Sequence, residues 1–217
     1  MQKKIKTISY EEMLEMASLG AKVMQPISIQ DARLNRIEID VKSSFINKRG
    51  TLITKRKNIF NNKTIAGLTS TKNDAKVTLI GVKDKPGVAA SVFKPLSQNY
   101  VNVDMVVQTS SSNNRETDIT FTIKSEDLKK TIRFIKQNSQ IKYRDLIVNK
   151  NVSKVSIIGV GMVTTPGVTY RMFQTLASKG INILVISTSE IKISVLINKQ
   201  NIKKALSALH KEFKLNS

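Results

Sequence analysis

The strongest constraint on this 217-residue chain is an internal repeat in its second two-thirds. The segment 76–82 (KVTLIGV) recurs at 154–160 (KVSIIGV), and a Pro-Gly-Val motif occurs at both Pro86 and Pro166. The offset is 78 residues for the first pair and 80 for the second, so two residues are inserted between the glycine and the proline. Two copies are too few for a solenoid. The repeat therefore predicts a pair of homologous small domains.

Each copy shows the same order of predicted elements. In the first copy these are a strand at 77–82, a helix from 88, a strand at 101–107 with alternate residues on one face, a strand at 117–123, a helix from Ser125 (as its cap) to 138 and a strand at 143–148. The order βαββαβ is that of an α+β, ferredoxin-like sandwich with helices on one face of an antiparallel sheet. We expect one such sandwich per copy.

The second copy lacks a closing strand. Its predicted elements are strands at 155–160, 181–187 and 191–197 and helices at 167–179 and 201–213, after which the chain stops at Ser217. A spare strand-like segment at 64–70 precedes the first copy. Counting strands therefore predicts that this segment completes the second sheet and that the first copy is inserted within the second. The predicted domains are 1–57, 64–71 plus 152–217, and 72–151.

Residues 1–57 follow a different pattern. Ser9 and Glu12 form a capping box that predicts a helix to about Met24, and a second helix follows from Pro26 to Leu34. Short strands are predicted at 37–41 and 51–54. So few residues bury little core alone, which suggests the tail of a larger α/β domain. The polar segment 57–63 is interpreted as a linker, and Glu11, Glu12 and Glu15 as a solvated helix face.

Composition excludes several classes of chemistry. The chain has no cysteine and a single histidine, His210, which we interpret as a surface residue. Disulfides, thiolate metal sites, cysteine nucleophiles and histidine-based triads are therefore excluded within one chain. The sequence has neither an apolar run long enough to span a membrane nor a secretory signal at its start. We expect a cytoplasmic protein with no membrane association and no metal site.

The net charge of +20 invites a nucleic-acid interpretation, because lysine and arginine displace counterions from phosphates. However, the basic residues are scattered, and aromatic residues make up only 5% of the chain. No aromatic strand offers a surface on which bases could stack. A solvated basic surface, produced by a coding bias toward lysine, isoleucine and asparagine, is favoured over nucleic-acid binding.

The turn Asp84–Gly87 joins a predicted strand to a predicted helix. Free N–H groups at a helix N-terminus attract an anion such as an α-carboxylate, and Asp84 would suit an ammonium group. Asn102, Asp104 and Gln108 on the next strand would contact polar atoms of the same ligand. The alternative is a simple Pro-Gly turn without a ligand. The equivalent loop at 161–167 lacks the acid, so the second copy either binds nothing alone or supplies one wall of a shared pocket.

These motifs resemble the aspartate kinase family over residues 8–214. The segment 9–24, and 43–45 with 50–54, are similar to the end of its catalytic domain. The segments that resemble the family's first ACT domain are 76–82, 84–87, 104–108 and 117–121. Those that resemble its second ACT domain are 159–162, 166–169 and 187–194. The resemblance implies tandem ACT domains after a remnant of an amino-acid-kinase domain. The family's N-terminal Lys-Phe-Gly-Gly type motif is absent, so ATP and Mg²⁺ would be bound by a catalytic partner or a missing N-terminal half, and no cofactor by this chain.

The family also implies a mechanism, in which lysine or threonine binds where ACT domains pair and favours an inhibited state. The effector residues that the resemblance carries over are Asp84, Lys85, Pro86, Gly87, Val88, Ala89, Asn102, Val103, Asp104, Gln108 and Thr120 in the first copy. In the second copy they are Val163, Thr164, Val168, Thr169, Asn182, Ile183, Ser189 and Glu190. No catalytic residue is assigned to this chain.

Three functions follow as alternatives. The first is a regulatory, amino-acid-sensing part of aspartate kinase, like its β subunit, for feedback control of lysine, threonine, methionine and diaminopimelate synthesis. As partners it would have a second copy of itself or a catalytic chain in an α2β2 assembly. The second is the C-terminal part of a split kinase that phosphorylates aspartate only with an N-terminal fragment. The third is a basic nucleic-acid binder.

Overall fold

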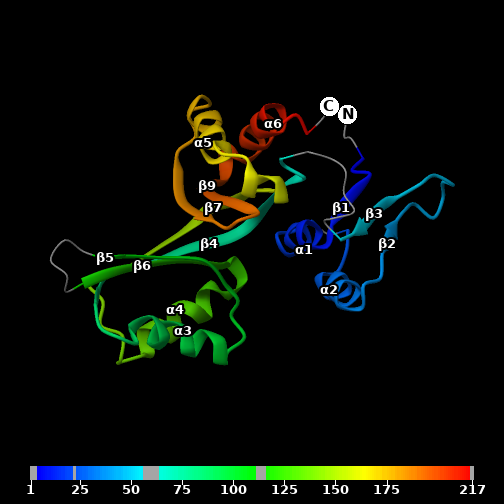
Figure 1. The fold of residues 1–217 in the computed structure, drawn as a ribbon. Coiled ribbons are helices and arrows are strands. Elements are labelled where there is room, and N and C mark those ends of the chain that lie inside the picture. Colours follow the sequence, from blue (N-terminus) through cyan, green and yellow to red (C-terminus); the bar gives the residue numbers. More distant parts are fainter. Residues whose placement is uncertain (1–3, 22, 56–63, 111–115, 216–217) are drawn as a thin grey trace.

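The computed structural model describes residues 4–21, 23–55, 64–110 and 116–215. A large antiparallel sheet forms the centre of the molecule, with a smaller N-terminal body beside it (Figure 1). The sheet has six strands in the order β5-β6-β4-β7-β9-β8. Their bounds are β4 Gly67–Lys83, β5 Val103–Ser110, β6 Glu116–Lys124, β7 Asp145–Ile158, β8 Ile183–Thr188 and β9 Lys192–Asn198.

The long strands β4 and β7 belong to both repeats. The first part of β4, Gly67–Thr71, pairs with Lys154–Ile158, whereas Lys76–Ile80 pairs with Asp145–Asn149. The register shifts twice between these two stretches, near Asp74. The segment at 64–70 thus joins its sheet to the second repeat, as counting strands predicts. The exact domain limits stay a prediction.

The helices cover the sheet in two separate layers. Helices α3 (Val88–Gln98) and α4 (Leu128–Gln137) lie on one side of the molecule, and α5 (Val168–Ala177) and α6 (Ile202–Glu212) on the other (Figure 1). Short 3-10 turns, η2 (Ser125–Asp127), η3 (Val160–Thr164) and η4 (Lys199–Asn201), connect them to the strands. This is the tandem α+β arrangement that the repeat predicts.

Each repeat has its own apolar core. Fully buried Leu79, Leu96 and Phe121 belong to the first, and Leu176 and Val195 to the second. A small additional cluster of buried residues joins the two halves where β5 contacts β8, and it comprises Met105, Val152, Val185 and Leu196. The two units are therefore held together by shared strands and by shared apolar packing.

The N-terminal body contains a second sheet, β1-β3-β2, with bounds Thr7–Ser9, Thr51–Thr54 and Ile39–Val41. Strands β1 and β3 are parallel, as expected for a piece of an α/β domain. Helices α1 (Tyr10–Ser18) and α2 (Pro26–Asn35) pack on it. The predicted capping box is confirmed, because the Ser9 hydroxyl accepts from Glu12 N–H at 3.1 Å and the Glu12 carboxylate accepts from Ser9 N–H at 3.2 Å.

Several predicted details were wrong. Helix α1 ends at Ser18 rather than near Met24, since Gly20 follows in a left-handed conformation with φ +107°. Ser125 does not cap a helix but begins η2, and α4 has no side-chain cap. Strand β5 bulges after Asp104, so Met105 turns into the cluster between the halves. The alternation predicted for 101–107 is therefore interrupted.

The linker predicted at 57–63 lies outside the described residues, which exclude 56–63. None of the helices in the described part of the chain is long and apolar enough to cross a membrane.

We expect Leu176→Ala to destabilise both repeats together. Removing this buried side chain should lower the free energy of unfolding by about 2–5 kcal/mol. Because β4 and β7 run through both units, amide exchange should accelerate in β6 of the first unit as well as in α5. Leu96→Ala, at the equivalent position of the first repeat, provides the reciprocal test. Exchange that accelerates only within the mutated unit would contradict this coupling.

Candidate functional site

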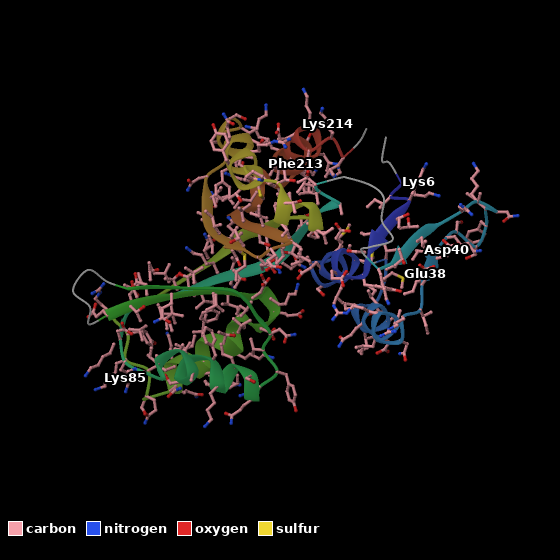
Figure 2. The ribbon with its side chains drawn as sticks, viewed as in Figure 1. Lys6, Glu38, Asp40, Lys85, Phe213 and Lys214 are labelled. Atoms are coloured by element: carbon pink, nitrogen blue, oxygen red, sulfur yellow. The ribbon has the colours of Figure 1, made fainter. Side chains whose placement is uncertain are left out.

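Two equivalent hollows lie at the starts of α3 and α5. The first has a volume of about 450 Å³ and is lined by Asp84, Lys85, Pro86, Gly87, Val88, Ala89 and Gln108. The second has a volume of about 510 Å³ and is lined by Met162, Val163, Thr165, Pro166, Gly167, Val168, Thr169, Thr188, Ser189, Glu190 and Ile193. Figure 2 shows Lys85 at the outer end of the first unit, exposed to solvent. The repeat has thus built the same kind of hollow twice.

A glycine in the left-handed conformation opens each helix. Gly87 has φ +88° and Gly167 has φ +87°, values that a residue without Cβ adopts readily. Neither helix has a side-chain cap, and their first intrahelical bonds reach these glycine carbonyls, from Ser91 and Arg171, both at 3.0 Å. In α3 the Val88 N–H already donates to Lys85 O at 3.1 Å, so the donors left in its first turn are those of the next two residues, whereas the Val168 N–H of α5 has no intrahelical acceptor. Both hollows therefore offer backbone donors to an anion.

Each hollow also contains one acidic side chain. Asp84 lies in the turn of the first hollow, as predicted. The second loop lacks an acid, but the turn between β8 and β9 brings Glu190 into its hollow. Gln108 and Thr188, which the offset of 80 relates, close corresponding sides of the two hollows. Both hollows thus combine backbone donors with a carboxylate, the two features that a free amino acid requires.

Other predicted site residues lie elsewhere in the single chain. Asn102 and Val103 line a separate hollow of about 460 Å³, together with Phe93, Ser97, Tyr100, Val101 and Val106. Thr120 lies within β6, where its hydroxyl pairs with that of Thr78 at 3.0 Å. In the second repeat, Asn182 precedes β8 and Ile183 begins it, and neither lines the hollow, while the Thr164 hydroxyl donates to Gly161 O at 3.3 Å. One chain does not bring these residues to the helix starts, so their role as effector contacts stays a prediction.

Asp104 forms an ion pair instead of facing either helix start. Its carboxylate binds the ammonium group of Lys154, which is 5% exposed on β7, and also accepts from Met105 N–H at 2.9 Å. Burial raises the pKa of the Asp104 carboxyl, but the hydrogen bond and charge of Lys154 lower it by more, so the net pKa is below 3.8. This pair links the first repeat to the second.

Sequence reasoning named the loop 161–167, which contains Met162, Thr165, Pro166 and Gly167, only as one wall of a shared pocket, and it missed Thr188 and Ile193. Applying the offset of 80 to Gln108 would have identified Thr188. Interpreting Glu11, Glu12 and Glu15 as a solvated face was also wrong, because Glu12 is only 4% exposed and Glu15 pairs with Lys192 at 3.0 Å. These contacts cross more than 140 residues of sequence, so helix periodicity cannot indicate them.

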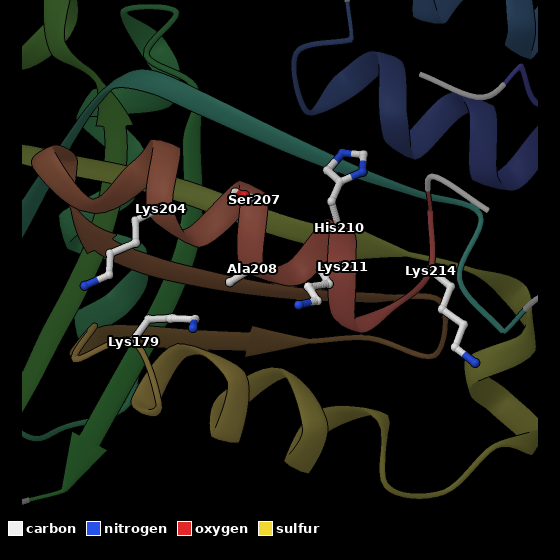
Figure 3. Close-up of a pocket in the computed structure, with 7 residues that line it drawn as sticks. All are labelled: Lys179, Lys204, Ser207, Ala208, His210, Lys211 and Lys214. Carbon is white, nitrogen blue, oxygen red and sulfur yellow. The ribbon is translucent and has the colours of Figure 1, made fainter. Parts of the chain in front are cut away.

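A further hollow of about 760 Å³ lies along α6 and is lined by Lys179, Lys204, Ser207, Ala208, His210, Lys211 and Lys214. Figure 3 shows Lys179, Lys204 and Lys211 along one side of α6, whereas His210 points to the other. The Nδ1 atom of His210 is buried without a hydrogen-bond partner, so this residue is not simply at the surface. The lining has no acid to hold an ammonium group, and we therefore exclude this hollow as an amino-acid site.

Comparisons with known proteins agree with this geometry. An ACT domain family model matches residues 77–138 and 155–213, which is more than half of the chain. The fold and the paired hollows thus define a tandem ACT-domain protein.

The regulatory subunit of aspartate kinase from Thermus thermophilus is 36% identical, with a TM-score of 0.65 over 70% of this chain and 99% of that chain. A solved structure of aspartokinase alpha and beta subunits is 38% identical, with a TM-score of 0.63 over 69% of this chain and 99% of that chain. The aspartokinase of Pseudomonas aeruginosa is 41% identical over 99% of this chain and 53% of its own length. The chain belongs to the aspartate kinase family and corresponds to its C-terminal regulatory part. It spans about half the length of the curated relatives that it matches.

We expect the Asp104–Lys154 pair to stabilise the fold above its titration range and not below it. Because the folded-state pKa of Asp104 is lowered, its contribution is present above the ordinary value of 3.8 and is lost as pH falls through the lowered value. Asp104→Asn should cost about 1–2 kcal/mol at pH 7, a figure reduced for the half-exposed carboxylate.

Urea unfolding of the wild type and of Asp104→Asn, at pH 7 and at acid pH, tests this expectation. The difference between their free energies of unfolding should become smaller at acid pH. Glu116→Gln, which removes a more exposed pair with Arg144, is the control and should have a smaller effect. A constant difference at all pH values would contradict the assignment.

Proposed function

We propose that this chain senses lysine, threonine or both at its ACT domains and thereby regulates aspartate kinase activity. The observation that carries the proposal is the hollow at a helix start, built twice with a left-handed glycine and an acidic side chain. In the first hollow, the N–H groups after Val88 in the first turn of α3 would donate to the α-carboxylate, and Asp84 would accept from the ammonium group. Membership of the aspartate kinase family supports the choice of effector and of regulated reaction.

Regulation requires a difference in effector affinity between two states of the kinase, because a ligand with equal affinity for both shifts nothing. A coupling of about 1–3 kcal/mol is typical of such systems. The effector would favour the inhibited state by closing the hollow against a second chain. ATP and Mg²⁺ would bind to the catalytic half rather than to this chain. We also propose a cytoplasmic location without nucleic-acid or membrane partners.

The edge of the first unit supports a second chain as partner. Strand β5 is one of the two outer strands of the six-stranded sheet, and Tyr100 before it and Val106 within it are 92% and 52% exposed. Exposed apolar side chains of this kind on an outer strand suit contact with a second copy, beside the part of β5 that packs against β8. Pairing of two copies there would bring Asn102 and Val103 of one copy toward an interface. The solved alpha and beta subunits of a related aspartokinase make an α2β2 assembly an equally direct proposal.

We expect Gly87→Asp to weaken amino-acid binding while retaining the fold. A Cβ at Gly87 meets no atom within 4 Å, so the new carboxylate lies in open space and repels the ligand carboxylate. Like charges in contact cost enough to raise the dissociation constant about tenfold or more. Calorimetric titration with lysine and with threonine measures the change.

Gly180→Asp is the matched control, because Gly180 also has positive φ and open space but lies outside both hollows. It reproduces the backbone strain and added charge without the site, so its binding should match the wild type. Undiminished binding by Gly87→Asp would remove the first hollow as the effector site, and Gly167→Asp then tests the second hollow in the same way.

A second candidate function is supported by the N-terminal body. Several of its large apolar side chains are more than half exposed, namely Val23, Ile27, Leu34, Ile37, Phe45 and Ile46. Phe45 is 97% exposed, and apolar surface of this kind marks a protein contact. The body would then complete a kinase domain with an N-terminal catalytic fragment.

Co-expression with the N-terminal half of a related aspartokinase tests this second function. We expect aspartate phosphorylation by ATP only when both polypeptides are present, and Phe45→Ser should reduce the yield of the complex. If the two polypeptides do not associate in size-exclusion chromatography, this second function is ruled out and only the regulatory function remains.

A further inference from the structure

The carboxylate of Glu12 connects two parts of the chain that are 148 residues apart. One oxygen, Oε1, accepts from the backbone N–H of Val160 at 2.9 Å. The other, Oε2, accepts from the N–H and the hydroxyl of Ser9 at 3.2 and 3.1 Å, within the capping box of α1. Glu12 is only 4% exposed, so these donors replace water as the hydrogen-bond partners of its carboxylate.

Val160 begins η3, the turn that forms one wall of the second hollow. Met162 and Val163 within this turn line the hollow directly. The residue before it, Gly159, donates its N–H to Ile191 O at 2.9 Å and is closely packed, because an added Cβ would meet Thr64 O at 2.2 Å. The bond from Glu12 therefore holds the first residue of a turn that is also anchored through Gly159, and it contributes to the position of this wall.

Helix α1 also contacts the opposite wall. Glu15, one turn after Glu12, pairs with Lys192 at 3.0 Å. The carbonyl of Lys192 accepts from Ser189 N–H at 2.8 Å, and Ser189, Glu190 and Ile193 line the hollow. Two carboxylates on one helix of the N-terminal body thus reach both walls.

We propose that Glu12 is a positioning residue for the second hollow. It ties α1 to the turn Val160–Thr164, so that amino-acid affinity in this hollow depends on the docking of α1. Linkage makes the dependence reciprocal, and a ligand in the hollow would in turn stabilise the docked helix. The inference rests on the proposed function for its ligand but concerns a contact that exists without one.

Glu12→Asp is the sharpest variant, because it keeps the charge near the start of α1 and withdraws the carboxylate from Val160 by one methylene. Glu12→Gln keeps an oxygen that can accept from Val160 and should rescue part of the effect. Ser9→Ala is the matched control, since it weakens the same capping box but leaves the bond to Val160 in place. All variants are made in the full 217-residue chain.

Two measurements decide the proposal. Amide exchange of residues 160–164 without ligand should accelerate about tenfold in Glu12→Asp, less in Glu12→Gln, and little in Ser9→Ala. In titrations with lysine and with threonine, followed by the amide signals of Thr169 and Ile193, the dissociation constant at the second hollow should rise about threefold to tenfold in Glu12→Asp. Thermal unfolding checks that each variant is folded.

The failures of the two proposals are distinguishable. Unchanged exchange of the turn in Glu12→Asp, or an unchanged dissociation constant where the wild type binds, overturns the positioning role. If the wild type binds neither amino acid at this hollow, the proposed function fails there, and the exchange rates alone decide whether Glu12 positions the turn. An equal effect of Ser9→Ala on both measurements would reduce Glu12 to a helix cap and also overturns the proposal.

Discussion

The antiparallel pairing of β4 with β7 is the interaction on which the rest of this structure depends. Both strands extend from one repeat into the other, so every remaining strand joins the sheet through one of them. The shift of register near Asp74 separates the two halves of the pair without breaking it. Each half then supports its own helices and its own core. The two hollows occur at equivalent places because each follows a strand end that this pairing has fixed.

Much of this arrangement could be predicted from the sequence, and the reason is its repetition. The offset of 78 to 80 residues located two equivalent units, and the glycines at 87 and 167 indicated equivalent helix starts. Strand counting correctly gave 64–70 a partner in the second repeat, because a sheet of this order leaves one position open. The capping box at Ser9 was likewise visible, since it depends on two residues three positions apart. Local rules and internal symmetry were sufficient for these features.

Contacts between distant elements could not be predicted. The bulge at Met105 follows from packing between the two halves, and no local pattern in 101–107 indicates it. The ion pair of Asp104 with Lys154, 50 residues away, is likewise not indicated by any local pattern. In each case the deciding partner comes from another strand, whose distance in sequence is set by the topology.

Pairing within the β4–β7 ladder places the two ends of the first repeat beside each other. The chain enters the first repeat near Thr71 and leaves it near Lys154, and these residues are direct partners in the β4–β7 ladder. The first repeat is therefore joined to the rest of the chain, its host, only through two neighbouring positions on paired strands. Exchanging it requires only two neighbouring junctions on paired strands, and the host keeps its full set of strands. In such a layout, recombination can replace one ACT unit and leave the other, with its attachment to the N-terminal body, unchanged.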